Sequence, residues 1–250
     1  FDGDGDEDLF MTHLVNETNT LYVNDGQGNF DDTTDRIGLG SGSKAFTGFG
    51  TAWFDPDNDG WLDLFVANGD VKIEEQRASR GPYAFDQPNQ LFLNRDGRRF
   101  EVWQPADDPA TALSEISRGV AFGDVDRDGD VDMLVTNNSG PVRLLLNDTE
   151  PRHAWLGLRL VGTESPRSAD GARVRIEDDL GVVRWRRVHS DGSYLSASDR
   201  EILVGLADAT AVTDLRVLWP SGRREQFTVT GGVRQRVTLT EGTGAPWPTP

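Results

Sequence analysis

The chain has 250 residues, no cysteine and a formal net charge of −17 at pH 7. Disulfides and thiolate metal sites are therefore excluded, the acidity disfavours binding to nucleic-acid phosphates, and no segment approaches the ~20 apolar residues that a membrane-spanning helix needs. With 28 glycines and 36% hydrophobic residues, the composition favours short strands joined by turns.

Three aspartate-rich segments recur in the first 148 residues, each directly before a predicted strand. They are "DGDGDED" (2–8), "DPDNDGWLD" (55–63) and "DVDRDGDVD" (124–132). The shared pattern is D-x-D-x-D-G-x-x-D, and the first copy fits it if position 1 precedes residue 1. Strands are predicted after these segments at 9–12, 64–68 and 133–137, and before them at 48–53 and 118–122.

The repeat extends beyond the aspartates. "NTLYVNDGQGNF" (19–30) aligns without a gap with "NQLFLNRDGRRF" (89–100), and "VRLLLND" (142–148) begins a third copy. An insertion of about 15 residues falls within 70–88, and one helical turn is the most we expect in 109–117. Because units with about four short strands have the size of propeller blades, residues 1–148 are predicted to form a partial, all-β propeller.

The aspartate pattern indicates calcium, which takes six to eight oxygen ligands in proteins. Carboxylates at positions 1, 3, 5 and 9 and a carbonyl at position 7 would surround the ion, and glycine at position 6 permits the sharp turn. The predicted ligands are Asp55, Asp57, Asp59, the Trp61 carbonyl and Asp63 in the second copy, Asp124, Asp126, Asp128, the Asp130 carbonyl and Asp132 in the third, and Asp2, Asp4, Asp6 and Asp8 in the first. We therefore expect two or three calcium sites. Because position 1 of the first copy would lie before residue 1, we also expect a longer protein of which this chain is part.

Other interpretations of the pattern are weaker. An EF-hand needs a bidentate glutamate at position 12, where this chain has Val66 or Val135. All-oxygen ligands argue against zinc or copper, whereas magnesium stays an alternative. Asp-Gly pairs alone form tight β-turns, but turns do not explain four acids in nine residues at matching positions.

The repeat stops after residue 148, and 149–153 read as a linker. Residues 154–241 are predicted to form a separate β-sandwich-like domain, and residues 242–250 a loosely held tail. Trp53, Trp155, Trp185 and Trp219 lie in strand patterns and are expected in the core, whereas Trp61 lies on a metal loop and is expected to be exposed. The predicted strands of the second domain are 155–161, 172–177, 182–189, 201–204, 214–219, 225–229 and 233–240.

Two groups of motifs resemble known families. The aspartate loops with their flanking "FG" and "LDLFVANG" segments resemble FG-GAP/VCBS repeats, the blades of integrin-α-like propellers. The run "WLGLRLVG…GARVRI…SDGSYLSASD…LVGLADA…VLWPSG" resembles the ASPIC/UnbV domain. In this order, the two resemble the cartilage acidic protein family, which implies an extracellular calcium-binding protein with adhesive or matrix-like interactions and about seven blades, of which roughly two and a half are present here.

Three functional hypotheses follow. The first is an extracellular, cell-surface or periplasmic calcium-binding module that binds a protein or glycan ligand. The second is a structural subunit of a larger surface or membrane-associated assembly. The third is an enzyme acting on extracellular polymers, which we disfavour because His13, His153 and His189 lack a recognisable nucleophile motif nearby.

Overall fold

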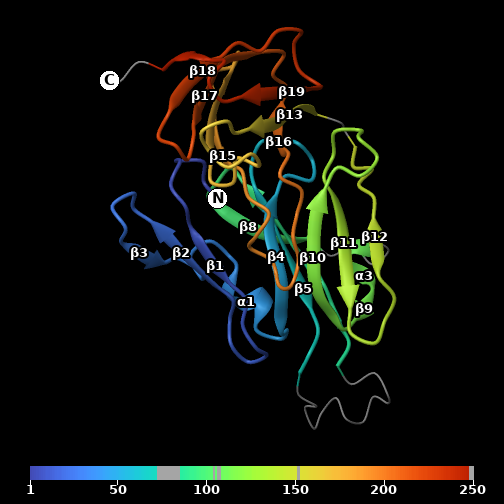
Figure 1. Cartoon of the computed structure of the whole chain (residues 1–250). Coiled ribbons are helices and arrows are strands. Elements are labelled where there is room, and N and C mark those ends of the chain that lie inside the picture. The colour runs from blue at the N-terminus through green and yellow to red at the C-terminus, as the bar shows by residue number, and fades with distance from the viewer. Residues whose placement is uncertain (72–84, 104, 106–107, 151–152, 248–250) are drawn as a thin grey trace.

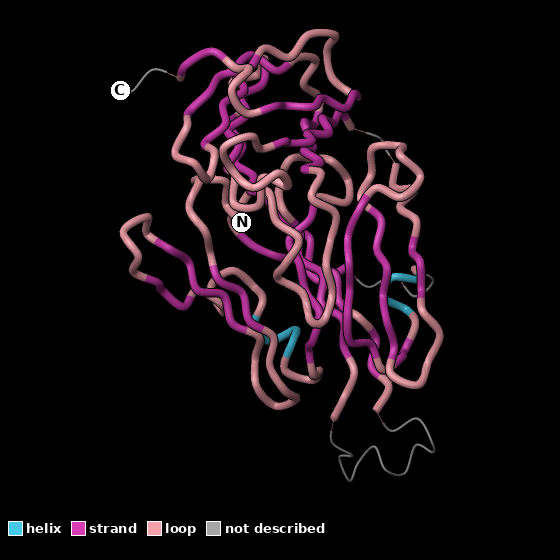
Figure 2. Tube along the Cα trace, in the orientation of Figure 1, coloured by secondary structure: helices cyan, strands magenta, loops and turns pink. Residues whose placement is uncertain are grey.

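The computed structural model describes the whole chain except residues 72–84, 104, 106–107, 151–152 and 248–250. Within the described residues the structure consists of short strands, and its two helices, α1 (Gly40–Ser43) and α3 (Pro109–Ala112), are four residues long. The predicted all-β class is confirmed (Figures 1 and 2). Helix α3 is the turn expected within 109–117, and it begins where Asp108 Oδ1 accepts a hydrogen bond from the Ala110 N–H at 2.8 Å.

Three antiparallel sheets form the N-terminal part (Figure 1). Their strand orders are β1-β2-β3, β4-β5-β7-β8 and β10-β11-β12. A short pair joins β6 (Gln87–Pro88), which lies between β5 and β7 in the chain, to β9 (Ser114–Glu115), which directly precedes β10. Three sheets of the described residues do not close a ring, so the propeller arrangement stays a prediction. The strands are β1 (Leu9–Met11), β2 (Thr20–Asn24), β3 (Phe30–Asp32), β4 (Gly48–Phe54), β5 (Asp63–Asn68), β7 (Gln90–Arg95), β8 (Arg99–Trp103), β10 (Ser117–Gly123), β11 (Asp132–Asn137) and β12 (Arg143–Leu145).

Every residue of strand β5 is buried, and its side chains enter two apolar cores that connect the second sheet to the first and to the third. Side chains alternate along a strand, so Leu64 and Val66 pack into a core shared with the first sheet, around Leu21. Phe65 and Ala67 point the other way, into a core shared with the third sheet. The continuous apolar run after the second aspartate loop therefore supplies both faces of a central strand.

The predicted insertion in 70–88 is described only at its ends, because residues 72–84 lie outside the described residues. At its far end, the buried Gln87 side chain accepts a hydrogen bond from the Thr47 N–H at 2.8 Å. This contact ties the end of the insertion to the segment that enters β4.

Residues from 154 onward form two further sheets around a separate apolar core. One has the order β16-β13-β19 and contains a parallel pair, β13 with β19, which the sequence pattern did not predict. The other has the order β15-β14-β17-β18-β20. The strands are β13 (Ala154–Val161), β14 (Arg173–Asp178), β15 (Val183–Arg187), β16 (Ile202–Ala207), β17 (Val212–Leu218), β18 (Arg224–Phe227), β19 (Gln235–Thr240) and β20 (Ala245–Pro246).

The end of the chain departs from the prediction of a loose tail. Ala245 and Pro246 form β20 and pair with β18. The buried Glu225 carboxylate accepts hydrogen bonds from the N–H groups of Gly242 and Gly244 at 3.0–3.1 Å. This carboxylate holds residues 242–244, while residues 245–247 are held by the pairing with β18 and by a hydrogen bond from the Trp247 N–H to the Arg224 carbonyl at 3.2 Å. No apolar pattern in the tail indicates these contacts.

Glu241, at the end of β19, is a buried carboxylate with a full set of donors. It accepts hydrogen bonds from the N–H groups of residues 163–165 at 2.7–2.8 Å and from the hydroxyls of Ser165 and Ser221. Burial alone would raise its pKa, but the hydrogen bonds, led by that from Ser221, outweigh this effect and lower the pKa to about 2.

We expect Glu241→Gln to lower the free energy of unfolding by about 2–3 kcal/mol at pH 7, since hydrogen bonds to a charged group are lost. Because the folded-state pKa is below the unfolded value, the wild type should hold this stability above about pH 4.5 and lose it as the pH falls toward 2. Urea unfolding at several pH values checks this, with the exposed Glu101→Gln as control. Equal pH dependence in the wild type and Glu241→Gln would contradict the assignment.

Candidate metal centre

The three aspartate loops lie at the same end of their sheets, facing the C-terminal domain (Figure 1). We call residues 2–8 loop 1, residues 55–63 loop 2 and residues 124–132 loop 3. Loop 2 joins β4 to β5 and loop 3 joins β10 to β11. In both, the strand ladder ends at position 9, where Asp63 pairs with Phe54 and Asp132 pairs with Gly123.

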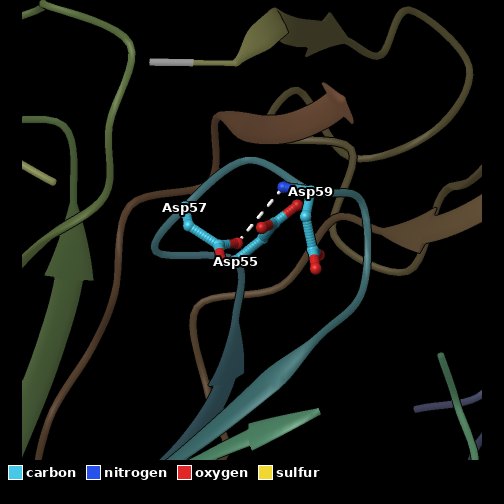
Figure 3. A group of neighbouring side chains, drawn as sticks. All are labelled: Asp55, Asp57 and Asp59. Carbon is cyan, nitrogen blue, oxygen red and sulfur yellow. Dashed lines mark hydrogen bonds between the residues drawn. The ribbon is translucent and has the colours of Figure 1, made fainter. Parts of the chain in front are cut away.

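Loops 2 and 3 each gather three carboxylates. One oxygen each from Asp55, Asp57 and Asp59 lies within 4.8 Å of the others (Figure 3), and the same holds for Asp124, Asp126 and Asp128. The turn is fixed by backbone hydrogen bonds to the same carboxylates. The Asp57 carboxylate accepts from the Asp59 N–H at 3.2 Å, as Asp126 does from Asp128 at 3.3 Å.

Two positions of each loop have left-handed backbone. Glycine at position 6 has φ of +95° in loop 2 and +103° in loop 3, as the sequence pattern predicted. Its N–H donates to the position 1 carboxylate at 2.9 Å in both loops. Position 4 also has positive φ, at Asn58 (58°) and Arg127 (67°), which the pattern did not reveal because these residues are not glycine.

The position 1 carboxylates are the most constrained groups of the site. Asp55 is 3% exposed, and its Oδ1 atom has no hydrogen-bond partner among the described residues. The equivalent Oδ1 of Asp124 is likewise buried and has no partner in the part of the chain that the structure describes. Burial raises the pKa of Asp55 to about 8, although Arg186 acts to lower it. An unpartnered buried carboxylate oxygen is costly, and a cation bound by the three carboxylates would remove that cost.

Position 9 ties each loop to a neighbouring strand, and its role in closing the metal shell stays a prediction. The Oδ1 atoms of Asp8, Asp63 and Asp132 accept hydrogen bonds from the N–H groups of Asn24, Asn94 and Asn147, at 3.0, 2.5 and 2.8 Å. These asparagines recur at one position of the sequence repeat. Position 9 therefore anchors each loop to the neighbouring strand, and the gathered carboxylates are those of positions 1, 3 and 5.

The side chains of the two position 7 residues, Trp61 and Asp130, contact other parts of the protein. Trp61 is half-buried, and its ring lies against Gly97, so it is less exposed than expected. Asp130 is buried, and its carboxylate accepts a hydrogen bond at 2.6 Å from the side chain of Asn58, which thereby links loop 2 to loop 3. The ligand role of their carbonyls stays a prediction.

Loop 1 repeats the turn without gathering its carboxylates. The Asp4 carboxylate accepts from the Asp6 N–H at 3.0 Å, and Gly3 and Gly5 have positive φ, as positions 4 and 6 do elsewhere. Among the described residues, however, Asp2, Asp4, Asp6 and Asp8 do not form a group within the distance that loops 2 and 3 reach. Only two of the three predicted sites therefore have gathered ligands.

The C-terminal domain packs directly on the loop glycines. A Cβ atom at Gly5 would lie 2.7 Å from the Trp185 ring, and one at Gly129 would overlap the Trp155 ring. Both tryptophans are half-buried at this interface, so their expected place in a core is wrong, whereas Trp219 is 1% exposed within the core of the C-terminal domain. Trp53, also half-buried, packs against the core around Leu21.

Arginines of the C-terminal domain face all three loops. Arg187 lies 3.5 Å from Glu7 in loop 1, Arg186 donates to the Gly60 carbonyl of loop 2 at 3.0 Å, and Arg236 pairs with Asp124 of loop 3. A cavity of about 340 Å³ lies between the loops and these arginines. The interface is therefore one of carboxylates against guanidinium groups.

The three histidines contact carboxylates. His13 lies 3.3 Å from Glu17 and 3.4 Å from the Thr20 hydroxyl, His189 lies 3.3 Å from Asp191, and His153 lies 3.7 Å from Asp208. Of these only His189 lines the cavity beside the loops. The expectation of a non-enzymatic function stays a prediction.

Comparison with known proteins agrees with the motifs. Residues 1–66 match the family model of the FG-GAP-like repeat, and residues 162–246 match that of ASPIC and UnbV. The chain thus combines an FG-GAP-like repeat with an ASPIC/UnbV domain, in the order that the sequence motifs indicated. A search of the curated proteins found no match. Within the described residues no helix is long and apolar enough to cross a membrane.

We expect Asp57→Ala and Asp126→Ala each to remove one of two bound calcium ions, because the carboxylates gather separately in loops 2 and 3. Calorimetric titration measures the stoichiometry. Asp25→Ala, in an exposed turn outside the loops, is the control and should leave it unchanged. An unchanged stoichiometry in both loop variants would rule out the ligand assignment.

Proposed function

We propose that the protein is extracellular and binds calcium, and that loops 2 and 3 hold the ions. The observation that supports this proposal is a pair of buried oxygens, on Asp55 and Asp124, that have no hydrogen-bond partner within the described residues. Each belongs to position 1 of a three-carboxylate group. FG-GAP-like repeats are typical of extracellular proteins, which supports the location.

The donor set favours calcium over other metals. Each group consists of carboxylate oxygens, without a histidine or cysteine, and hard oxygen ligands suit calcium or magnesium rather than zinc or copper. Magnesium demands a strict octahedron at short distances, whereas calcium accepts six to eight ligands in a flexible shell. A loop that offers three carboxylates and the predicted carbonyl of position 7 fits the larger ion better.

Calcium would also support the contact between the two parts of the chain. Loop 2 touches β16, where the Ala207 N–H donates to the Asn58 carbonyl at 2.9 Å. In loop 3 the Asn58 side chain donates to the Gly129 carbonyl at 3.1 Å. An ion that stiffens these turns would stiffen the surface on which the ASPIC/UnbV domain packs.

Binding of a partner protein is the second part of the proposal. Val142, Leu144 and Leu146 alternate along and beside β12, are 50–58% exposed, and Leu144 pairs across the sheet with the exposed Leu134. Within the described residues β12 pairs only with β11, so one edge of the third sheet is open. An open edge with an apolar face favours the hypothesis of a structural subunit in a larger assembly.

We expect chelator to lower the melting temperature of the intact chain by several degrees. Extracellular modules bind calcium with Kd of about 10⁻⁴ to 10⁻³ M, so roughly 1 mM calcium stabilises by about 0.4–1.4 kcal/mol per site. Thermal melts with calcium, with chelator, and with magnesium in place of calcium measure this, and magnesium should restore stability only in part. The Asp57→Ala/Asp126→Ala double variant is the control, and an equal chelator shift in it would contradict the proposal.

We expect a partner to co-purify in stoichiometric amounts in calcium, and Leu144→Arg to abolish this because it places a charge on the open edge. Leu180→Arg, at another exposed leucine outside the third sheet, should leave the partner bound. Pull-down from a native extract, in calcium and in chelator, measures both. Retention by Leu144→Arg would exclude this edge as the contact.

A further inference from the structure

Loops 2 and 3 share one backbone geometry but face different counter-charges. In loop 3 the guanidinium of Arg236, on β19, pairs with the position 1 carboxylate of Asp124 and also donates to the Arg127 carbonyl at 3.2 Å. Among the described residues Asp55 of loop 2 has no ion pair with a basic side chain. Arg186, which lies beside it, donates instead to the carbonyls of Trp185 and Gly60.

Arg236 is held in place by two further groups, besides Asp124 and the loop carbonyl. Its Nε–H donates to the Glu201 carboxylate at 2.7 Å, its guanidinium lies 5.0 Å above the Trp155 ring, and that ring packs on Gly129 of loop 3. The side chain is only 20% exposed. If a cation took its place at Asp124, Arg236 would keep Glu201 as a partner and would not be left as an unpaired buried charge.

We infer that Arg236 is an intramolecular competitor of calcium at loop 3, an inference that rests on the proposed function. The guanidinium pairs with Oδ2 of Asp124, whose Oδ1 accepts no hydrogen bond within the described residues, so calcium and Arg236 would share one carboxylate. Calcium at loop 3 displaces the guanidinium toward Glu201, because two positive charges at one carboxylate repel each other. Loop 3 therefore binds calcium more weakly than loop 2. Since Arg236 belongs to the C-terminal domain, calcium at loop 3 changes the contact between the two parts of the chain.

The decisive experiment isolates loop 3. In an Asp57→Ala background, which silences loop 2, Arg236→Gln should raise the calcium affinity of the remaining site on the order of tenfold, the size expected when one nearby positive charge is removed from a partly solvated site. Calorimetric titration measures the affinity. In an Asp126→Ala background, which silences loop 3, Arg236→Gln should change the affinity less than about twofold.

Arg216→Gln is the matched control. Arg216 also pairs with an aspartate, Asp214, at 2.7 Å and also lies over a tryptophan ring, Trp247 at 5.3 Å, but it does not line the cavity beside the loops. In the Asp57→Ala background it should leave the calcium affinity of loop 3 unchanged. A rise equal to that of Arg236→Gln would show a general charge effect and overturn the inference.

A second measurement keeps Arg236 intact, in case Arg236→Gln does not fold. Calcium titration of the Asp57→Ala protein should change the fluorescence of Trp155 as the guanidinium leaves its position over the ring, and a Trp155→Phe variant should lack that component. Bound calcium without a Trp155 signal, or an unchanged or lower affinity in Arg236→Gln, overturns the inference and leaves the proposed function standing. Absence of calcium binding in every variant, wild type included, refutes the proposed function and the inference with it.

Discussion

Carboxylates crowded at the end of the sheets are the constraint around which this structure is arranged. Each of loops 2 and 3 holds three of them with one oxygen each within 4.8 Å of the others. One oxygen of Asp55 and one of Asp124 are buried and accept no hydrogen bond from any residue that the structure describes. Such groups repel one another and lose hydration, so they persist only where other interactions hold the backbone. The loop hydrogen bonds, the asparagine anchors and the C-terminal domain together do this.

The asparagines explain why the repeat extends so far beyond the aspartates. Asn94 uses its N–H for Asp63, its side-chain amide for the Leu62 carbonyl at 3.0 Å and its side-chain oxygen for the Gly97 N–H at 2.9 Å. Asn24 makes the equivalent contact to Asp8 in the first copy. One residue thus fastens the end of an aspartate loop to the strand that follows. The contact recurs although the asparagine lies 16, 31 and 15 residues after the aspartate in the three copies, so the geometry of the pair is kept while the length of the intervening chain varies.

The C-terminal domain completes the loop environment instead of standing apart from it. Strand β15 lies between loops 1 and 2, with Trp185 against Gly5 and Arg184 against Gly60, while β13 and β19 supply Trp155 and Arg236 to loop 3. Glycine at position 6 is therefore required twice, for its positive φ and for the close approach of these side chains. The two parts of the chain meet where carboxylates of the loops face arginines of the C-terminal domain, and these charges offset each other.

The sequence alone was sufficient for the all-β class, for the aspartate pattern and for the glycine at position 6, because these depend on local chemistry: alternation of apolar residues, carboxylate spacing and backbone freedom. It did not reveal the positive φ at Asn58 and Arg127, the anchoring role of Asp63, or the parallel pairing of β13 with β19. It also misplaced Trp155 and Trp185 in a core and left residues 242–247 without a partner. Only the tertiary structure decided these points, because each depends on a contact with a group distant in the chain. Examples are Asn94 for Asp63, Gly129 for Trp155 and Glu225 for Gly242. The periodicity of a segment reports which of its residues are apolar, but not which distant residues pack against it.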